Sequence, residues 1–320
     1  MSGRVFVSGG AGFIGSHLVD ALVRAGFEVN VLDDLSSGSA KHIRGHIDGG
    51  RVRFVRGDVR DGCILREVLK DCEMVFHLAA VTSVPFSVEH PDITFDVNVE
   101  GTRRLLEESL RAGVEQFIYF STCAVYGEAV YLPIDEKHPT NPMSPYAESK
   151  LRAEELCMRF YKKYGLGTTI LRLFNVYGPR MRGGRYSGVI MSFIERLMAG
   201  EPPIIYGDGG QSRDFVHVSD VVNAVMFASR SKRAVGEIFN VGTGIATSIA
   251  ELANLVMELF GVDGVEPIHM PSRRGDVRYS CADIGKLKTL LGYEPQIHLR
   301  DGLSSLLQHL KPKHVPCRLE

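Results

Sequence analysis

The first half of the chain alternates short, continuous apolar runs with longer segments of helical periodicity. The apolar runs predict strands at Arg4–Ser8, Glu28–Leu32, Val52–Val55, Met74–Leu78, Gln116–Ser121 and Thr168–Leu173. The periodic segments predict helices at Gly12–Ala25, Ile64–Lys70, Thr94–Ala112 and Pro145–Tyr164. Strands that are apolar at consecutive positions are typical of a sheet buried on both faces. We therefore expect an α/β fold, with a doubly wound parallel sheet between two layers of helices.

After Asn175 the pattern changes. Residues 178–188 are rich in Gly, Arg and Pro and are predicted to form a loop. The remaining predicted elements are helices at Val189–Ala199, Val218–Ser229 and Ser248–Phe260, and strands at Ile204–Tyr206 and Glu237–Val241. We interpret this part as a smaller C-terminal lobe whose chain returns to the first domain. The predicted division assigns 1–175 and 214–245 to the sheet domain, 176–213 and 246–312 to the lobe, and 313–320 to a tail.

Composition and charge narrow the class of protein. The 320 residues are 44% hydrophobic and carry 37 Lys and Arg against 38 Asp and Glu. A near-zero net charge offers no general attraction for nucleic acid or an anionic membrane. No run of 18 apolar residues occurs, and the six scattered cysteines form no Cys-x-x-Cys pair. We therefore expect a cytoplasmic protein without nucleic-acid partner, membrane span, disulfide framework or metal.

A glycine-rich turn follows the first predicted strand. Gly9, Gly12 and Gly15 are spaced Gly-x-x-Gly-x-x-Gly and open a helix. This arrangement allows a tight turn and lets backbone N–H groups approach a pyrophosphate at the helix N-terminus. The second predicted strand leads into Asp33, 18 residues after Gly15. A carboxylate there binds the adenine-ribose hydroxyls and repels a 2′-phosphate, so the pattern predicts NAD rather than NADP.

Asp58 follows the third predicted strand, and two interpretations stay open for it. It could accept a hydrogen bond from the adenine amino group of a dinucleotide. It could equally be the N-cap of the helical segment that begins near Asp61.

Tyr146 and Lys150 lie four residues apart at the start of a predicted helix, so their side chains share one face. A tyrosine titrates near pH 10, and a neighbouring ammonium is expected to lower that pKa and favour the phenolate. Ser121 and Thr122 end a central strand, where open α/β sheets bind ligands. A hydroxyl there can bridge a substrate oxygen and Tyr146, or it can simply cap the strand end.

Together these residues resemble the extended short-chain dehydrogenase/reductase family, and in particular its NAD-dependent nucleotide-sugar epimerases and dehydratases. The resemblance covers roughly residues 3 to 310. Its motifs are 9–15, 33–35, 57–58, 77–80, Asn98, 121–127, Tyr146 with Lys150, 174–179, 213–220 and 273–276. It implies a Rossmann sheet with a smaller substrate-binding lobe, a UDP-sugar partner and a homodimer formed through Thr94–Ala112 and Pro145–Tyr164.

The resemblance also assigns roles to residues of this chain. It implies NAD contacts at Gly9, Gly12, Phe13, Ile14, Gly15, Asp33, Asp34, Asp58, Val59, Leu78, Ala79, Ala80, Asn98, Tyr146, Lys150 and Phe174. It implies catalytic roles for Thr122, Tyr146 and Lys150, and nucleotide-sugar contacts at Thr122, Asn175, Val189, Tyr206, Arg213, Arg273 and Asp276. Arg213 and Asn175 would contact the phosphates, Tyr206 the uracil, and Arg273 and Asp276 phosphate and ribose. Arg213 could instead be a surface ion-pair residue.

One position separates activities within the family. The dehydratases carry Thr-Asp-Glu before Val-Tyr-Gly, whereas this chain has Thr122-Cys123-Ala124. Without that acid pair, the resemblance favours C4 epimerisation of UDP-galactose to UDP-glucose over dehydration, with Cys123 as a packed neighbour. Alternatives are an epimerase or decarboxylase for UDP-N-acetylhexosamine, UDP-glucuronate, or a GDP- or dTDP-sugar. A non-catalytic NAD-sensing protein is a further alternative. The small Ser280 would leave room for an N-acetyl group.

Overall fold

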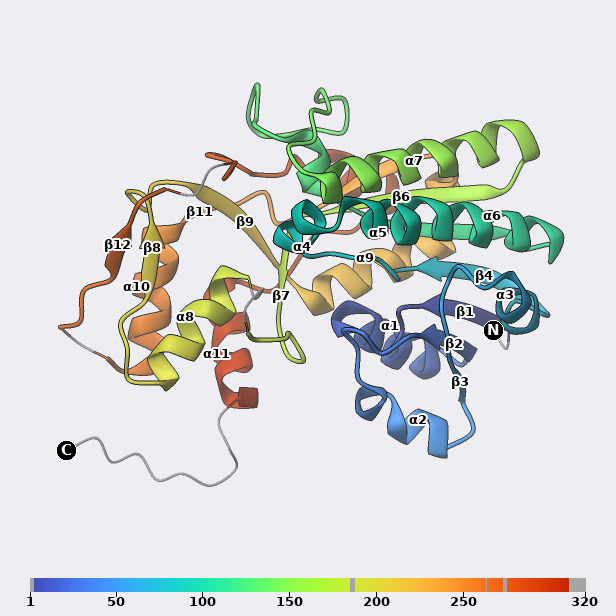
Figure 1. The fold of residues 1–320 in the computed structure, drawn as a ribbon, viewed down its shortest axis with the longest axis horizontal. Coiled ribbons are helices and arrows are strands. Elements are labelled where there is room, and N and C mark those ends of the chain that lie inside the picture. Colours follow the sequence, from blue (N-terminus) through green and yellow to red (C-terminus); the bar gives the residue numbers. More distant parts are fainter. Residues whose placement is uncertain (1–2, 185–187, 263, 273–274, 311–320) are drawn as a thin grey trace.

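The computed structural model describes residues 3–184, 188–262, 264–272 and 275–310. Its centre is a seven-stranded parallel sheet with the strand order β10-β6-β5-β4-β1-β2-β3 (Figure 1). The strands are β1 Arg4–Ser8, β2 Glu28–Asp33, β3 Val52–Arg56, β4 Cys72–His77, β5 Gln116–Thr122, β6 Gly167–Leu173 and β10 Ile238–Val241. All the strands predicted for this sheet are present, and Ile238–Val241 joins its edge.

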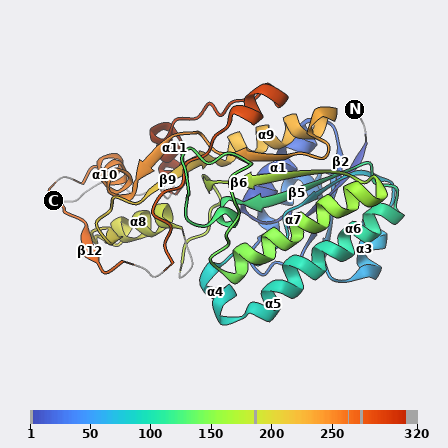
Figure 2. The same ribbon diagram turned by 90° about the horizontal axis from the view of Figure 1, so that it is seen from above.

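Helices cover both faces of this sheet, as Figures 1 and 2 show. On one face, α1 (Phe13–Arg24) packs against α9 (Val218–Arg230). The other face carries α3 (Gly62–Val68), α6 (Gly101–Arg111) and α7 (Pro145–Tyr164). Val5 and Val7 enter the core under α1 and α9, whereas Phe6 between them enters the core under α6 and α7. This division explains why the strands are apolar at consecutive positions, and it confirms the doubly wound α/β fold.

The helix predicted over Thr94–Ala112 is not continuous. Its region consists of α5 (Pro91–Phe95), a π-helical turn η2 (Asp96–Glu100) and α6, and the short helix α4 (Val84–Glu89) precedes it. The break precedes Gly101, where the helix lies close to the turn after β3: a Cβ on Gly101 would stand 2.7 Å from Val59 Cγ1. Short helices at η1 (Ala40–His42) and α2 (Arg44–Asp48) were also not predicted.

The C-terminal lobe is built on two small sheets. One has the order β11-β9-β7, and the other pairs β12 with β8. The strands are β7 Asn175–Tyr177, β8 Ile204–Tyr206, β9 Ser212–His217, β11 Ala246–Ser248 and β12 Ile268–Met270. The lobe's helices are α8 Val189–Met198, α10 Ile249–Phe260 and α11 Leu299–Leu310, which share one apolar core.

Several elements of this lobe carry no clear sequence signal. β9 begins with Ser212, Arg213 and Asp214, which no strand pattern marks. Outside the lobe's own sheets and helices, short helical turns occur at η3 Cys123–Tyr126 after β5, at η4 Lys232–Ala234 before β10, and at η5 Leu287–Leu291. None of the helices in the described ranges has the length and apolar character that a membrane crossing needs. The residue boundaries of the two domains stay a prediction.

Candidate active site

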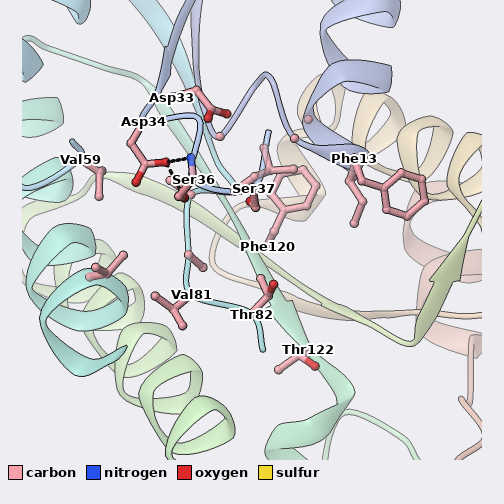
Figure 3. A pocket seen from close by; sticks show the side chains of 18 of the residues that line it. Phe13, Asp33, Asp34, Ser36, Ser37, Val59, Val81, Thr82, Phe120 and Thr122 are labelled. Carbon is pink, nitrogen blue, oxygen red and sulfur yellow. Dashed lines mark hydrogen bonds between the residues drawn. The ribbon is translucent and has the colours of Figure 1, made fainter. Parts of the chain in front are cut away.

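A cavity of about 620 Å³ opens at the carboxyl ends of the central strands. Its walls come from the turns after β1, β2, β3 and β4 and from the ends of β5 and β6. The chain order reverses at β1, which lies between β2 and β4, and open α/β sheets bind ligands at such a switch point. In Figure 3, Asp33 and Asp34 lie at one end of the view and Thr122 at the other. The cavity size suits a dinucleotide.

The glycine-rich turn lies against the neighbouring strand ends. Gly9 has a φ of +71°, and a Cβ there would stand 2.8 Å from Ala79 N. Gly12 precedes the first residue of α1, and among the described residues no side chain caps that helix start. The N–H groups at the start of α1 therefore remain available to an anion at the cavity wall. These features fit the diphosphate of a dinucleotide.

Gly15 makes the closest approach in this turn, because a Cβ added to it would stand 2.1 Å from Gly9 O. We expect Gly15→Ala to push the turn and α1 apart, lowering the free energy of unfolding by about 1–3 kcal/mol and weakening NAD binding. Chemical denaturation and calorimetric titration with NAD measure the two effects. Gly45→Ala is the control, since a Cβ there meets nothing within 4 Å. Wild-type NAD affinity in Gly15→Ala would contradict the role of this contact.

Two neighbouring aspartates shape the opposite end of the cavity. Asp33 is 7% exposed; its Oδ2 accepts from Ala11 N at 2.9 Å and its Oδ1 accepts from Leu35 N at 2.9 Å. Burial raises the pKa of Asp33, and these backbone hydrogen bonds oppose the rise. Each carboxylate oxygen keeps a second acceptor position for a ribose hydroxyl. Asp34 Oδ1 is hydrogen-bonded by Ser36 (Figure 3).

One of the two interpretations of Asp58 is wrong. The N-cap of α3 is Asp61, whose side chain accepts from the backbone of Cys63 and Ile64. Asp58 lines the cavity and accepts from Arg60 Nε at 2.9 Å, and this contact lowers its pKa. The contact of Asp58 with the adenine amino group stays a prediction.

The structure brings nearly all the predicted cofactor residues to one cavity. The residues of that set that line it are Gly9, Gly12, Phe13, Ile14, Gly15, Asp33, Asp34, Asp58, Val59, Leu78, Ala79, Ala80, Tyr146, Lys150 and Phe174. Asn98 lies behind the wall, where its Oδ1 accepts from Val81 N at 2.7 Å and its Nδ2 donates to Ser149 Oγ at 2.9 Å. It therefore holds the wall residue Val81 against α7.

Sequence reasoning missed a second group of wall residues, contributed by the loop between β7 and α8. Arg180, Met181 and Arg182 line the cavity from this loop. Arg180 Nη2 pairs with Asp20 Oδ2 of α1 at 2.8 Å, and Arg182 Nη1 donates to Ser37 O at 2.9 Å. No local pattern marks these contacts, because they join segments about 150 residues apart.

Thr122, Tyr146 and Lys150 meet at the end of β5. The Thr122 hydroxyl accepts from Ala124 N at 3.2 Å, which is the capping role considered for it, and it also lowers the pKa of Tyr146. A bridge from Thr122 to a substrate oxygen stays a prediction. Lys150 is 4% exposed, and its Nζ lies 4.2 Å from the centre of the Tyr119 ring.

The pKa values of this group differ from the sequence expectation. Burial raises the pKa of Tyr146 to about 12, and the hydrogen bond to Thr122 only partly opposes the rise. Burial lowers the pKa of Lys150 to about 7. The expected lowering of the tyrosine pKa by the ammonium is therefore wrong in this structure, where desolvation is the larger effect. At neutral pH the phenol is protonated and ready to donate.

Of the predicted substrate residues that the structure describes, Thr122 lines the cavity and the others lie outside its wall. Arg213 and Asp276 form an ion pair with each other, and the Arg213 side chain is 14% exposed. Asn175 Nδ2 donates to Asp214 O at 3.3 Å. Tyr206 ends β8 and Val189 begins α8. Arg273 lies outside the described residues.

Cys123 connects the two groups of residues. Burial raises the pKa of its thiol to about 11, a hydrogen bond with Ser280 lowers it, and so does the charge of Arg213. The positive charge of Arg213 therefore affects the residue next to Thr122. A protonated, partly buried thiol agrees with Cys123 as a packed neighbour. Within the described ranges, no group of three His, Cys, Asp or Glu side chains is placed to hold a metal ion.

Comparisons with known proteins agree with this site. The model of the NAD-dependent epimerase/dehydratase family matches residues 5–242. A putative UDP-glucose 4-epimerase of Methanocaldococcus jannaschii is 40% identical, covering 96% of this chain and 98% of the relative. A UDP-glucose 4-epimerase of Mycolicibacterium smegmatis is 38% identical, covering 97% and 99%.

Solved structures share the whole fold. A UDP-glucose 4-epimerase of Thermotoga maritima with UDP-glucose has a TM-score of 0.91 at 40% identity, covering 96% of this chain and 98% of that one. A UDP-glucuronic acid 4-epimerase of Bacillus cereus with UDP-glucuronic acid and NAD has a TM-score of 0.89 at 31% identity, covering 96% and 99%. The similar proteins thus act on more than one sugar.

Proposed function

This chain belongs to the NAD-dependent epimerase/dehydratase family, and from that premise we propose that it interconverts UDP-galactose and UDP-glucose by C4 epimerisation. The observation that carries the proposal is that Thr122 and Tyr146 line one cavity wall and that Thr122 lowers the pKa of Tyr146. Cys123 and Ala124 stand where an acid pair would be needed for dehydration. The relatives named UDP-glucose 4-epimerase support the same reaction.

The cavity residues fit NAD, which supplies a reversible hydride acceptor for C4 when bound. Thr122 and Tyr146 then form the path for the proton of the 4-hydroxyl group. Taking that proton requires the phenolate, so the tyrosine pKa must fall from about 12 when the site fills. Lys150 lies four residues further along the same helix face, and its ammonium is the cation that would lower the pKa of Tyr146.

The lobe provides a place for the diphosphate of the sugar nucleotide. The guanidinium of Arg213 forms an ion pair with the carboxylate of Asp276, in the way it would pair with a phosphate. We propose that the diphosphate takes the place of Asp276 on Arg213, which frees Asp276 for the ribose. The charge of Arg213 lowers the pKa of Cys123, the residue after Thr122. A diphosphate bound to Arg213 would therefore place its sugar beside Thr122.

The direct test is turnover without added reductant. Purified protein with UDP-galactose is expected to reach the UDP-glucose equilibrium mixture, followed by chromatography of the nucleotide sugars. A parallel panel of UDP-N-acetylglucosamine, UDP-glucuronate, GDP-mannose and dTDP-glucose separates the alternatives. Conversion of another sugar in place of UDP-galactose would overturn the proposed substrate. Bound NAD without conversion of any sugar would favour a non-catalytic NAD-sensing protein.

The small Ser280 lies near Cys123, and it keeps a UDP-N-acetylhexosamine as the second candidate substrate.

The homodimer through α6 and α7 stays a prediction, and so does the cytoplasmic location. In Figures 1 and 2 these two helices lie side by side along one face of the sheet.

A further inference from the structure

A buried ion pair lies directly behind the proton-transfer group. Glu154 on α7 and Arg172 on β6 have side chains that are 3% and 5% exposed. Arg172 Nη2 donates to Glu154 Oε2 at 2.6 Å, and Arg172 Nε donates to Oε1 at 3.0 Å. Such a pair adds little to stability, because desolvating both charges offsets most of their attraction. A contribution to stability therefore does not explain why the Glu154–Arg172 pair lies behind the proton-transfer group.

The pair is connected to the strand that carries Thr122. Ser121 Oγ donates to Glu154 Oε1 at 2.5 Å, and β5 and β6 are paired so that Ser121 lies opposite Arg172. Thr122 is the next residue of β5. Glu154 itself follows Tyr146 and Lys150 at four-residue spacing, so all three side chains lie on one face of α7. One carboxylate thus joins α7 to both strands.

The far side of Arg172 is fixed as well. Its guanidinium carbon lies 4.7 Å from the centre of the Tyr126 ring, and Tyr126 Oη donates to Asn240 Oδ1 at 2.7 Å. Arg172 Nη1 is buried and has no hydrogen-bond partner among the described residues. A buried donor left unpaired lowers the stability of the fold. The unpaired Nη1 therefore favours a role of the Glu154–Arg172 pair in the geometry of the site over a role in stability.

We propose that Glu154, held by Arg172 and Ser121, is a positioning residue for proton transfer: it fixes the helix of Tyr146 and Lys150 onto the strand of Thr122. The inference rests on the proposed proton path through Thr122 and Tyr146. A displacement of about 1 Å between reacting groups can cost a hundredfold in rate. α7 therefore needs a fixed register against β5.

The charges around Lys150 support this role. Lys150 faces Tyr119 from β5, His77 from β4, and Glu154 and Cys157 from its own helix. Burial raises the pKa of the Cys157 thiol well above its usual range and lowers the pKa of His77 to about 3, so both are neutral near pH 7. Cys157 and Glu154 both raise the pKa of Lys150 against the effect of burial, and Glu154 is the carboxylate of the two.

The test compares two buried glutamates. We expect Glu154→Gln to lower kcat by about ten- to a hundredfold with little change in KM. Without the Glu154 carboxylate the pKa of Lys150 is lower, so the alkaline limb of the kcat–pH profile is expected to move to lower pH. Glu108→Gln on α6 is the control, since Glu108 is 5% exposed and pairs with Arg66 and Arg111 away from the cavity.

The measurements are kcat, KM, the pH profile, NAD affinity and thermal unfolding, made with whichever nucleotide sugar the wild type converts. Failure of the UDP-galactose proposal therefore leaves this comparison intact. A Glu154→Gln protein with wild-type kcat and pH profile overturns the inference, and so does a loss no larger than that of Glu108→Gln. Should Glu154→Gln not fold, Ser121→Ala removes one contact only, and an unchanged kcat in that variant overturns the inference.

Discussion

Replacing Tyr146 by phenylalanine is expected to lower kcat for UDP-galactose epimerisation by roughly a hundred- to ten-thousand-fold, the range of a lost general acid–base group. The substitution removes one oxygen at the cavity wall, whose pKa Thr122 lowers. The ring stays, so packing at the start of α7 is preserved. We expect NAD affinity to change little, because most of the cavity wall lies on other elements.

Initial rates of UDP-glucose formation measure this effect, and calorimetry measures bound NAD. Tyr131→Phe is the matched control: its hydroxyl donates to Asp135 in an exposed loop and lies outside the cavity. Full activity of Tyr146→Phe would show that the sugar proton leaves by another group. Loss of activity together with loss of NAD would show that Tyr146 is needed for binding the cofactor.

Replacing Asp214 by asparagine is expected to lower the free energy of unfolding by about 1–3 kcal/mol for each buried backbone donor that loses its acceptor. Asp214 is fully buried. Its Oδ1 accepts from Thr243 N at 2.8 Å and Thr243 Oγ1 at 2.6 Å, and its Oδ2 accepts from Gly244 N at 2.9 Å and Ala282 N at 3.2 Å. An amide has only one acceptor oxygen, so its NH₂ group would face two backbone donors.

Denaturant unfolding of the wild type and the variants at one fixed pH measures this loss. Asp283→Asn is the matched control, because Asp283 uses one oxygen to accept from Gly285 N at 2.7 Å in an exposed turn. That control is expected to stay within about 0.5 kcal/mol of wild type. Since Arg213 precedes Asp214 on β9, a folded Asp214→Asn protein is also expected to have a raised KM for the nucleotide sugar. Equal stability of the two variants would contradict the role of the buried carboxylate.

Much of the sheet domain could be predicted from sequence because its signals are local. A parallel strand covered on both faces must be apolar at consecutive positions, as Val5, Phe6 and Val7 are. The prediction was weaker where tertiary packing overrides the pattern. The π-helical turn at Asp96–Glu100 interrupts an otherwise regular helix. β7, Asn175–Tyr177, is short and starts with a polar residue, so it lacks the apolar run by which the equally short β8 was predicted.

The pKa values show the same limit within the site. The four-residue spacing of Tyr146 and Lys150 correctly indicated one helix face, but it carried no information on burial. In the structure, desolvation raises the tyrosine pKa and lowers the lysine pKa. The direction of both shifts depends on how many atoms surround each group, and only the fold decides that number.

The sequence by itself determined the glycine turn, the acid after β2 and the Tyr146–Lys150 pair, because each is defined by backbone geometry over a few residues. The tertiary structure alone decided the Arg213–Asp276 ion pair, the loop residues Arg180–Arg182 at the cavity, and the contacts of Glu154 with Arg172 and Ser121. These contacts join strands and helices that are distant in the chain. Their partners are set by sheet order and strand register, and no local spacing encodes either one.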